Sequence, residues 1–167
     1  MATETQRRHV VATIDWLHSK ASQLDYPPGD QRTWRDTYSW NLSEQAAEHL
    51  LAGGGRLQMD CSEMGSWILR CAGLWHWSQP GWTGSHLQLL TQHYTDARQA
   101  YPGALVIFGS PPGHHEAVVY ERDGTHGNPI VASHGRPGFD LVRLHDMQAE
   151  QASSGHPGVT FLSIAHL

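Results

Sequence analysis

The sequence has few cysteines, few charges and no long apolar run. Its 167 residues include two cysteines, Cys61 and Cys71, and charged residues make up 16%. No apolar segment approaches the roughly 20 residues that a membrane-spanning helix needs, so we expect no membrane span. Lys20 is the only lysine, the net charge is −5 with histidine neutral, and the basic residues are scattered. Because no basic stripe could follow a phosphate backbone, we expect no nucleic-acid partner.

Motifs of several enzyme classes are also absent from the sequence. It contains no His-Glu-x-x-His and no cysteines paired at zinc spacing, so we expect no metal site despite 13 histidines. It contains no Gly-x-Ser-x-Gly elbow and no phosphate-binding loop. We therefore expect a protein that needs no cofactor.

The spacing of apolar residues changes from helical to strand-like along the chain. The expected helices cover residues 9–24, 43–52, 60–72 and 85–94. The expected strands cover residues 104–108, 116–121, 129–133, 140–145 and 159–164. Helices followed by antiparallel strands indicate an α+β fold. No linker divides the chain, so we expect residues 1–167 to form a single domain.

Cys61 is expected at the first position of the helix over residues 60–72. Asp60 followed by Glu63 has the spacing of a capping box, with Asp60 as the cap. Unpaired N–H groups and the helix dipole favour a thiolate at that position, which makes Cys61 a candidate nucleophile. Burial of Cys61 in the core is the alternative. Cys71 lies about 15 Å further along the same helix, too far for a disulfide, and is expected to be a small buried hydrophobe.

Two histidines fall on strands that a turn could join. His115 lies in the segment 113–120 and His134 in the segment 130–135, next to two of these strands, and residues 123–125 (Asp-Gly-Thr) have the composition of a hairpin turn. Either of two turn positions in this segment would place both histidines on one face, within about 8 Å of each other. His115 would then accept the thiol proton, and His134 would orient the imidazole of His115. For seven other histidines we expect no role, either at the surface or in the core: His76, His86, His93, His126, His145, His156 and His166.

These motifs resemble those of the NlpC-type cell-wall cysteine peptidases, in the version found in phage lysins and tail-associated hydrolases. The matching segments are Asp60-Cys61-Ser62, residues 102–109 (Pro-Gly-Ala-Leu-Val-Ile-Phe-Gly), His115-Glu116-Ala117-Val118-Val119 and Ser133-His134-Gly135. The resemblance covers about residues 58–145. It implies a papain-like fold, with N-terminal helices packed on a small antiparallel sheet, and a catalytic triad of Cys61, His115 and His134.

The resemblance also implies a function. It predicts an endopeptidase of phage origin that cleaves an amide bond in the stem peptide of peptidoglycan. The enzyme would be used in lysis or wall penetration, and association with a phage particle is one form that this use could take. An amidase, acyltransferase or deamidase of the same fold is an open alternative, as is a non-catalytic virion or wall-binding module with a remnant triad. Three residues depart from the usual family pattern: Glu63 replaces glycine, Ala104 replaces aspartate, and Glu116 replaces an apolar residue.

Aromatic residues supply candidates for substrate binding. The chain has seven tryptophans, and Trp75, Trp77 and Trp82 cluster after the nucleophile helix. Aromatic rings can stack on sugars or flat peptide chains, so Trp75, Trp82 and Tyr38 are candidate substrate-binding residues. Core packing is the alternative for the tryptophans. Relatives use a tyrosine near the oxyanion hole, and both Tyr26 and Tyr38 are candidates.

The N-terminal segment bears on where the protein is made. Residues 1–18 contain no apolar core followed by a small-residue cleavage site, so we expect no signal peptide. Synthesis would then take place in the cytoplasm. With a cell-wall substrate, the protein would act after release or as part of a virion.

Overall fold

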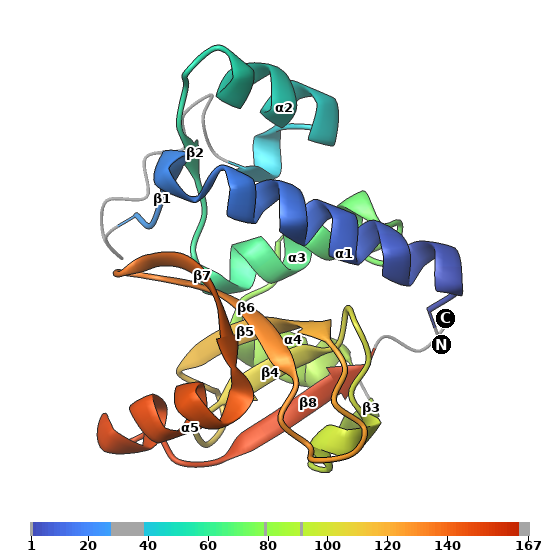
Figure 1. Ribbon diagram of the computed structural model, residues 1–167, viewed down its shortest axis with the longest axis vertical. Coiled ribbons are helices and arrows are strands. Elements are labelled where there is room, and N and C mark those ends of the chain that lie inside the picture. Colours follow the sequence, from blue (N-terminus) through green and yellow to red (C-terminus); the bar gives the residue numbers. More distant parts are fainter. Residues whose placement is uncertain (1, 28–38, 79, 91, 164–167) are drawn as a thin grey trace.

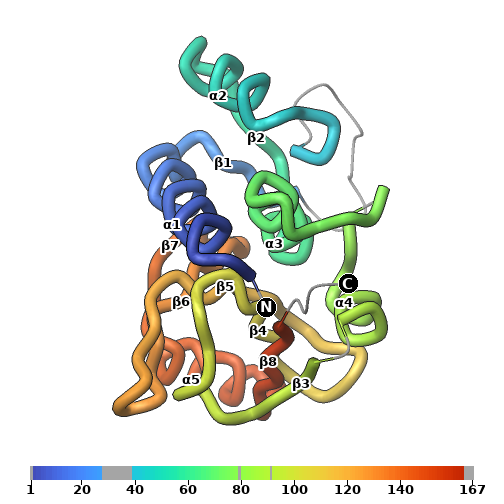
Figure 2. The backbone as a smooth tube through the Cα atoms, turned by 90° about the vertical axis from the view of Figure 1, so that its right-hand side faces the viewer, coloured from blue at the N-terminus to red at the C-terminus, as the bar shows by residue number. Residues whose placement is uncertain are grey.

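The computed structural model describes residues 2–27, 39–78, 80–90 and 92–163 and shows a mixed α+β architecture. Helices α1 and α3 lie over one side of a six-stranded antiparallel sheet (Figure 1). In the view turned by 90°, both helices keep their place on that side (Figure 2). None of the helices in the described ranges is long and apolar enough to cross a membrane.

Most helices begin where a side chain caps them. The helices are α1 Glu4–Ser19, α2 Glu44–Ala52, α3 Cys61–Cys71, α4 Thr83–Leu89 and α5 Leu144–Ser153. The predicted caps Ser43 and Asp60 are confirmed, since both side chains accept a backbone N–H from the first turn. The first helix starts earlier than predicted because Thr3 forms a capping box with Gln6. Helix α5 was not predicted.

The sheet contains all five predicted strands, with bounds that differ by a few residues. Its order is β3–β8–β4–β5–β6–β7. The strands are β3 Gln92–Tyr94, β4 Leu105–Phe108, β5 His115–Glu121, β6 Ile130–Gly135, β7 Gly138–Arg143 and β8 Val159–Ser163. Strand β3 occupies residues predicted to continue the fourth helix, which ends at Leu89 instead. The two short strands β1 Leu24–Asp25 and β2 Leu57–Gln58 pair in parallel and lie with the helices, outside this sheet.

The register between β5 and β6 differs from both predicted registers. Ala117 pairs with Ser133 and Val118 with Ala132, so the same register sets His115 opposite Gly135. A shift of one residue moves a side chain to the other face of a sheet. His115 and His134 therefore lie on opposite faces, and the prediction that they share a face is wrong.

The turn between β5 and β6 explains this difference. The backbone N–H of Gly127 donates to the Asp123 carbonyl, and Asp123 Oδ1 accepts N–H groups from Thr125 and His126. The turn is therefore longer than the tight hairpin expected, and a β-bulge interrupts the ladder between Val119 and Glu121.

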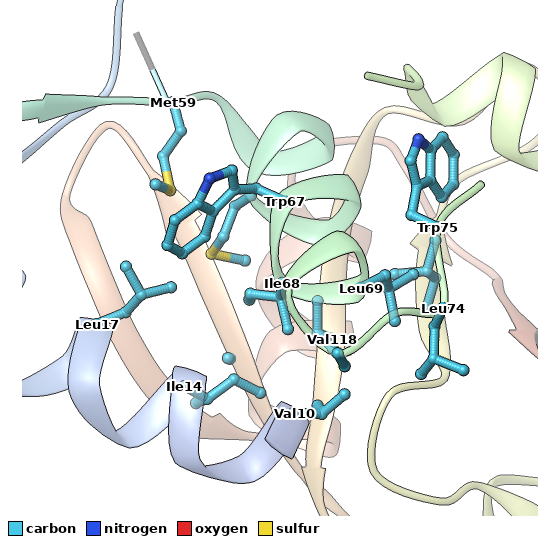
Figure 3. Packing of buried hydrophobic residues seen from close by; sticks show 14 of the residues in the cluster. Val10, Ile14, Leu17, Met59, Trp67, Ile68, Leu69, Leu74, Trp75 and Val118 are labelled. Carbon is cyan, nitrogen blue, oxygen red and sulfur yellow. The ribbon is translucent and has the colours of Figure 1, made fainter. Parts of the chain in front are cut away.

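The two faces of the sheet support two separate cores. On one face, Val118 packs with Ile14 of α1 and Ile68 of α3 (Figure 3). On the other, Ala117 and neighbouring apolar residues pack with Leu144 and Met147 of α5. Each fully buried aliphatic side chain contributes about 1.5–3 kcal/mol to folding. These cores fix which side chains of β5 and β6 face α3 and which face α5.

Candidate active site

The capping box at the start of α3 sets the position of Cys61. Asp60 Oδ1 accepts the N–H of Glu63 at 2.8 Å, and Glu63 Oε2 accepts the N–H of Asp60 at 2.9 Å. The Ser62 hydroxyl also donates to Asp60 Oδ1 at 2.9 Å. The predicted capping box is thus present, and Cys61 is the first residue of the helix.

The Cys61 thiol is buried and hard to ionise. It is 7% exposed, and burial, followed by the negative charges of Asp60 and Glu116, raises its pKa to about 12. Hydrogen bonds from the Glu116 backbone and the Tyr26 hydroxyl act in the opposite direction. Burial and these two charges thus oppose the thiolate that we expected at the helix N-terminus.

The second cysteine packs against the core, as predicted, but is less buried than predicted. Cys71 is half-buried against the same core as the rest of α3, and it makes no disulfide with Cys61. Burial is the main cause that raises its pKa to about 12. Cys71 therefore serves as a reference thiol on the same helix.

A pocket of about 540 Å³ opens beside the start of α3. Its lining comes from the α3 cap, β5, β6, the β6–β7 turn and α5, and includes Tyr26, Asp60, His115, Ser133, Arg136 and Gln151. Asp60, the neighbour of Cys61, and His115 thus face one cavity. A pocket with a few convergent polar groups is the usual form of a small-molecule or peptide site.

His115 is held by Ser133 rather than by His134. Its Nε2 lies 2.8 Å from Ser133 Oγ, on the face of the sheet that packs on α5. Burial, followed by the charges of His114 and His134, lowers the pKa of His115 to about 4. The ring is therefore neutral at pH 7, which is the state that a general base requires.

His134 lies on the sheet face that packs on α3. It is fully buried, and its ring lies edge-on to Tyr26 with centroids 5.5 Å apart. Burial lowers its pKa, while backbone groups of Asp25 and Gly138 oppose that effect. The predicted role of His134 as the residue that orients His115 is therefore contradicted, and Ser133 occupies that position.

The predicted aromatic contacts have different outcomes. Trp75 is 5% exposed and packs in the core against His86, which favours the core-packing alternative for this residue. Trp82 is 53% exposed and remains available to a ligand. Tyr38 lies outside the described residues. Of the two tyrosines proposed near the oxyanion hole, Tyr26 both lines the pocket and donates to the Cys61 thiol.

A buried polar cluster near Cys61 was missed by the sequence interpretation. Ser66, His86 and Glu116 are each 0% exposed. His86 Nε2 lies 3.0 Å from Ser66 Oγ, and His86 Nδ1 lies 2.5 Å from Glu116 Oε2. His86 is thus a core histidine that connects Ser66 to Glu116, and its expected lack of a catalytic role stays a prediction. The one available signal was Glu116, a charged residue at the start of an otherwise apolar strand.

Metal ligation has no support within the described ranges, where no group of three or more His, Cys, Asp or Glu residues is arranged to hold an ion. The site instead combines a buried thiol, two neutral histidines on opposite faces of the sheet, and a polar pocket. No protein-family model, curated protein or solved structure matches this chain.

Proposed function

We propose that this chain is a papain-like cysteine hydrolase that cleaves an amide bond, with Cys61 as its nucleophile. The observation that carries the proposal is the place of Cys61: it opens a capped helix beside a pocket that Asp60 and His115 both line. Tyr26 stands at the same pocket and donates to the thiol. A thiol, a nearby imidazole and a donor for the oxyanion are the parts that thiol hydrolysis needs.

The proposed substrate is the stem peptide of peptidoglycan. This part of the proposal rests on the resemblance of the motifs around Cys61, His115 and Ser133-His134-Gly135 to the NlpC-type peptidases. The reaction is then that of an endopeptidase, and a phage enzyme acting in lysis or wall penetration is the corresponding biological role. The protein would act at the wall after release or within a virion.

His115 is proposed as the base and Ser133 as its positioning residue. Ser133 occupies Nε2 of His115, which leaves Nδ1 to accept the thiol proton. We prefer His115 to His134 because it lines the pocket, whereas His134 is fully buried. His115 lies on the sheet face that packs on α5, whereas Cys61 lies at the start of α3, which covers the other face. The contact between His115 Nδ1 and the thiol must therefore form when substrate binds, as catalytic contacts often do.

The proposed reaction proceeds in two steps. As His115 takes the proton, the Cys61 sulfur attacks the amide carbonyl, and the Tyr26 hydroxyl and backbone N–H groups at the start of α3 stabilise the oxyanion. The C–N bond then breaks, and His115 returns the proton to the leaving amine. A water molecule, activated by His115, hydrolyses the thioester and restores the thiol.

Digestion of purified peptidoglycan tests this proposal. The wild-type protein and the Cys71→Ala variant should release fragments with new amine and carboxyl ends inside the stem peptide, as read by mass spectrometry. The Cys61→Ala variant should release none while remaining folded. Full activity of Cys61→Ala would contradict the mechanism, and cleavage between sugar and stem would identify an amidase instead.

One observation favours a second candidate, a non-catalytic wall-binding or virion module with a remnant triad. The Cys61 thiol is 7% exposed, and its pKa is raised to about 12, which is typical of an inert cysteine. This candidate predicts that the protein sediments with peptidoglycan but releases no fragment. It also predicts that Cys61→Ala sediments equally well.

A further inference from the structure

Trp82 is the most exposed of the large apolar side chains in the described ranges. It is 53% exposed, whereas Trp67 and Trp75 are 0% and 5% exposed. Two further large apolar residues, Leu89 and Tyr101, are 40% and 37% exposed. A single exposed apolar side chain is common at a protein surface and indicates nothing by itself. What distinguishes Trp82 is that its backbone and its ring are both held in place.

The backbone of Trp82 is fixed by Ser85 in the first turn of α4. The Ser85 hydroxyl accepts the Trp82 N–H at 2.8 Å and donates to the Trp82 carbonyl at 2.8 Å. The same carbonyl accepts the N–H of His86, a residue that is fully buried. These bonds attach the backbone of Trp82 to α4 and restrict the direction in which its side chain can point.

The ring of Trp82 lies against the backbone of Gly84 and against Pro112, in the loop between β4 and β5. A Cβ added to Gly84 would overlap the Cζ3 and Cη2 atoms of Trp82 and would lie 3.0 Å from Pro112 Cβ. The indole thus occupies space that glycine alone leaves open at position 84. The protein holds this ring in one place while leaving much of it open to solvent.

The held ring lies beside the loop that leads to the proposed base. Thr83 also packs on this loop, since a Cβ added to Gly113 would lie 3.2 Å from Thr83 Cβ. The residues after Gly113 are His114 and His115, and both line the pocket of about 540 Å³. A polymer that extends out of the pocket along this loop would therefore reach Trp82.

The surroundings of the ring carry no strong charge. Helix α4 (Thr-Gly-Ser-His-Leu-Gln-Leu) and residues 109–114 (Gly-Ser-Pro-Pro-Gly-His) contain no aspartate, glutamate, lysine or arginine. An anionic or cationic polymer would gain no ion pair from these two segments. The flat apolar plane of an indole instead suits the C–H groups of a sugar ring, and the neighbouring Thr83 hydroxyl suits the hydroxyls at the edge of that sugar.

We propose that Trp82 is a stacking platform for a neutral sugar of the glycan strand, so that the chain binds the polysaccharide of its substrate as well as the stem peptide. The inference rests on the proposed function, because that function makes peptidoglycan the substrate. Its test uses a sugar without any peptide and measures binding alone. The result is therefore the same whether or not the protein hydrolyses peptidoglycan, and the two proposals can fail separately.

The test titrates the wild-type protein with chitotetraose, a neutral oligomer of N-acetylglucosamine, a sugar that peptidoglycan also contains. Proton–nitrogen NMR follows the indole N–H signals, and the signal missing from Trp82→Phe is that of Trp82. This signal should shift and saturate at millimolar sugar. Backbone signals of residues 109–114 give the affinity of Trp82→Ala, which should be about tenfold weaker or more. Added salt should not weaken binding, because the sugar is uncharged.

Two matched variants separate a held platform from an exposed aromatic residue. Gly84→Ala keeps the indole but fills the space that it occupies, so this variant should weaken chitotetraose binding as Trp82→Ala does. Tyr101→Ala removes another exposed ring, which already has the guanidinium groups of Arg7 and Arg122 over it, each 4.4 Å from the ring centre. This variant should bind at the wild-type affinity. Wild-type affinity in Trp82→Ala or in Gly84→Ala would overturn the proposal.

Two other occupants of the platform give different results. If a second copy of the chain covers Trp82, analytical ultracentrifugation should show a dimer that Trp82→Ala converts to a monomer. If a peptide covers it, the stem tripeptide L-Ala-γ-D-Glu-L-Lys should shift the Trp82 signal and chitotetraose should not. Either result would overturn the proposal that Trp82 binds a sugar.

Discussion

Replacing Gly65 by alanine tests which face of the sheet meets α3. A Cβ added to Gly65 would clash with Glu116 Oε1 and would lie 3.2 Å from Leu105 Cδ2. Glu116 cannot move away easily, because it is fully buried and bonded to His86. Overpacking of this kind costs about 1–3 kcal/mol, and alanine returns about 1 kcal/mol of helix propensity. With the clash falling on a fully buried carboxyl group that is hydrogen-bonded to His86, we expect a net loss of up to about 2 kcal/mol.

Urea unfolding followed by tryptophan fluorescence measures this loss. Gly53→Ala is the control, because an added Cβ there meets nothing closer than 3.5 Å, and its effect should stay within about 0.5 kcal/mol. In a Glu116→Ala background the clash is gone, so Gly65→Ala should no longer destabilise. If Gly65→Ala stabilises the wild-type protein by about 1 kcal/mol, as propensity alone predicts, Glu116 does not face α3. The register of β5 would then be wrong by one residue.

The remaining predictions concern the base, the pH and the metal. His115→Ala should lower the hydrolysis rate by a factor of about 10² to 10⁴, and Ser133→Ala should lower it by less, as measured by initial rates on one peptide. A larger loss from His134→Ala than from His115→Ala would identify His134 as the base instead. The pKa of His115 falls from 6.5 to about 4 on folding, so the unfolded chain protonates first as the pH drops. Thermal stability should therefore decline between about pH 6.5 and 4, and His115→Gln should reduce that decline. Activity should survive EDTA and be lost to thiol alkylation; loss to EDTA with recovery on adding zinc would favour a metalloenzyme.

Local chemistry made the helices readable from sequence. Ser43 and Asp60 are capping residues with their partners a few positions away, so the starts of α2 and α3 follow from short-range hydrogen bonds. Helix α5 gives a weaker signal, because only Leu144 and Met147 of its residues are buried. The last predicted helix failed for a different reason: residues 92–94 pair with β8, a contact distant in sequence.

The strand register could not be read in the same way. It depends on how Asp123 accepts backbone N–H groups across a turn longer than a tight hairpin, and on a bulge after Val119. The alternation of apolar residues predicts neither feature. The predicted register was wrong by one residue, so His115 was expected on the sheet face that meets α3, where the structure has Glu116. The position of Cys61 at the start of α3 was therefore predicted correctly, but its neighbours were not.

Covalent labelling shows directly whether Cys61 is the nucleophile. A peptidyl chloromethyl ketone based on a stem peptide is added in small increments, and both labelling and peptidoglycan hydrolysis are measured on the same sample. If Cys61 is the nucleophile, one label attaches to Cys61 and none to Cys71, and hydrolysis falls in proportion to the label. Hydrolysis that persists after Cys61 is fully labelled would contradict the claim that Cys61 is the nucleophile.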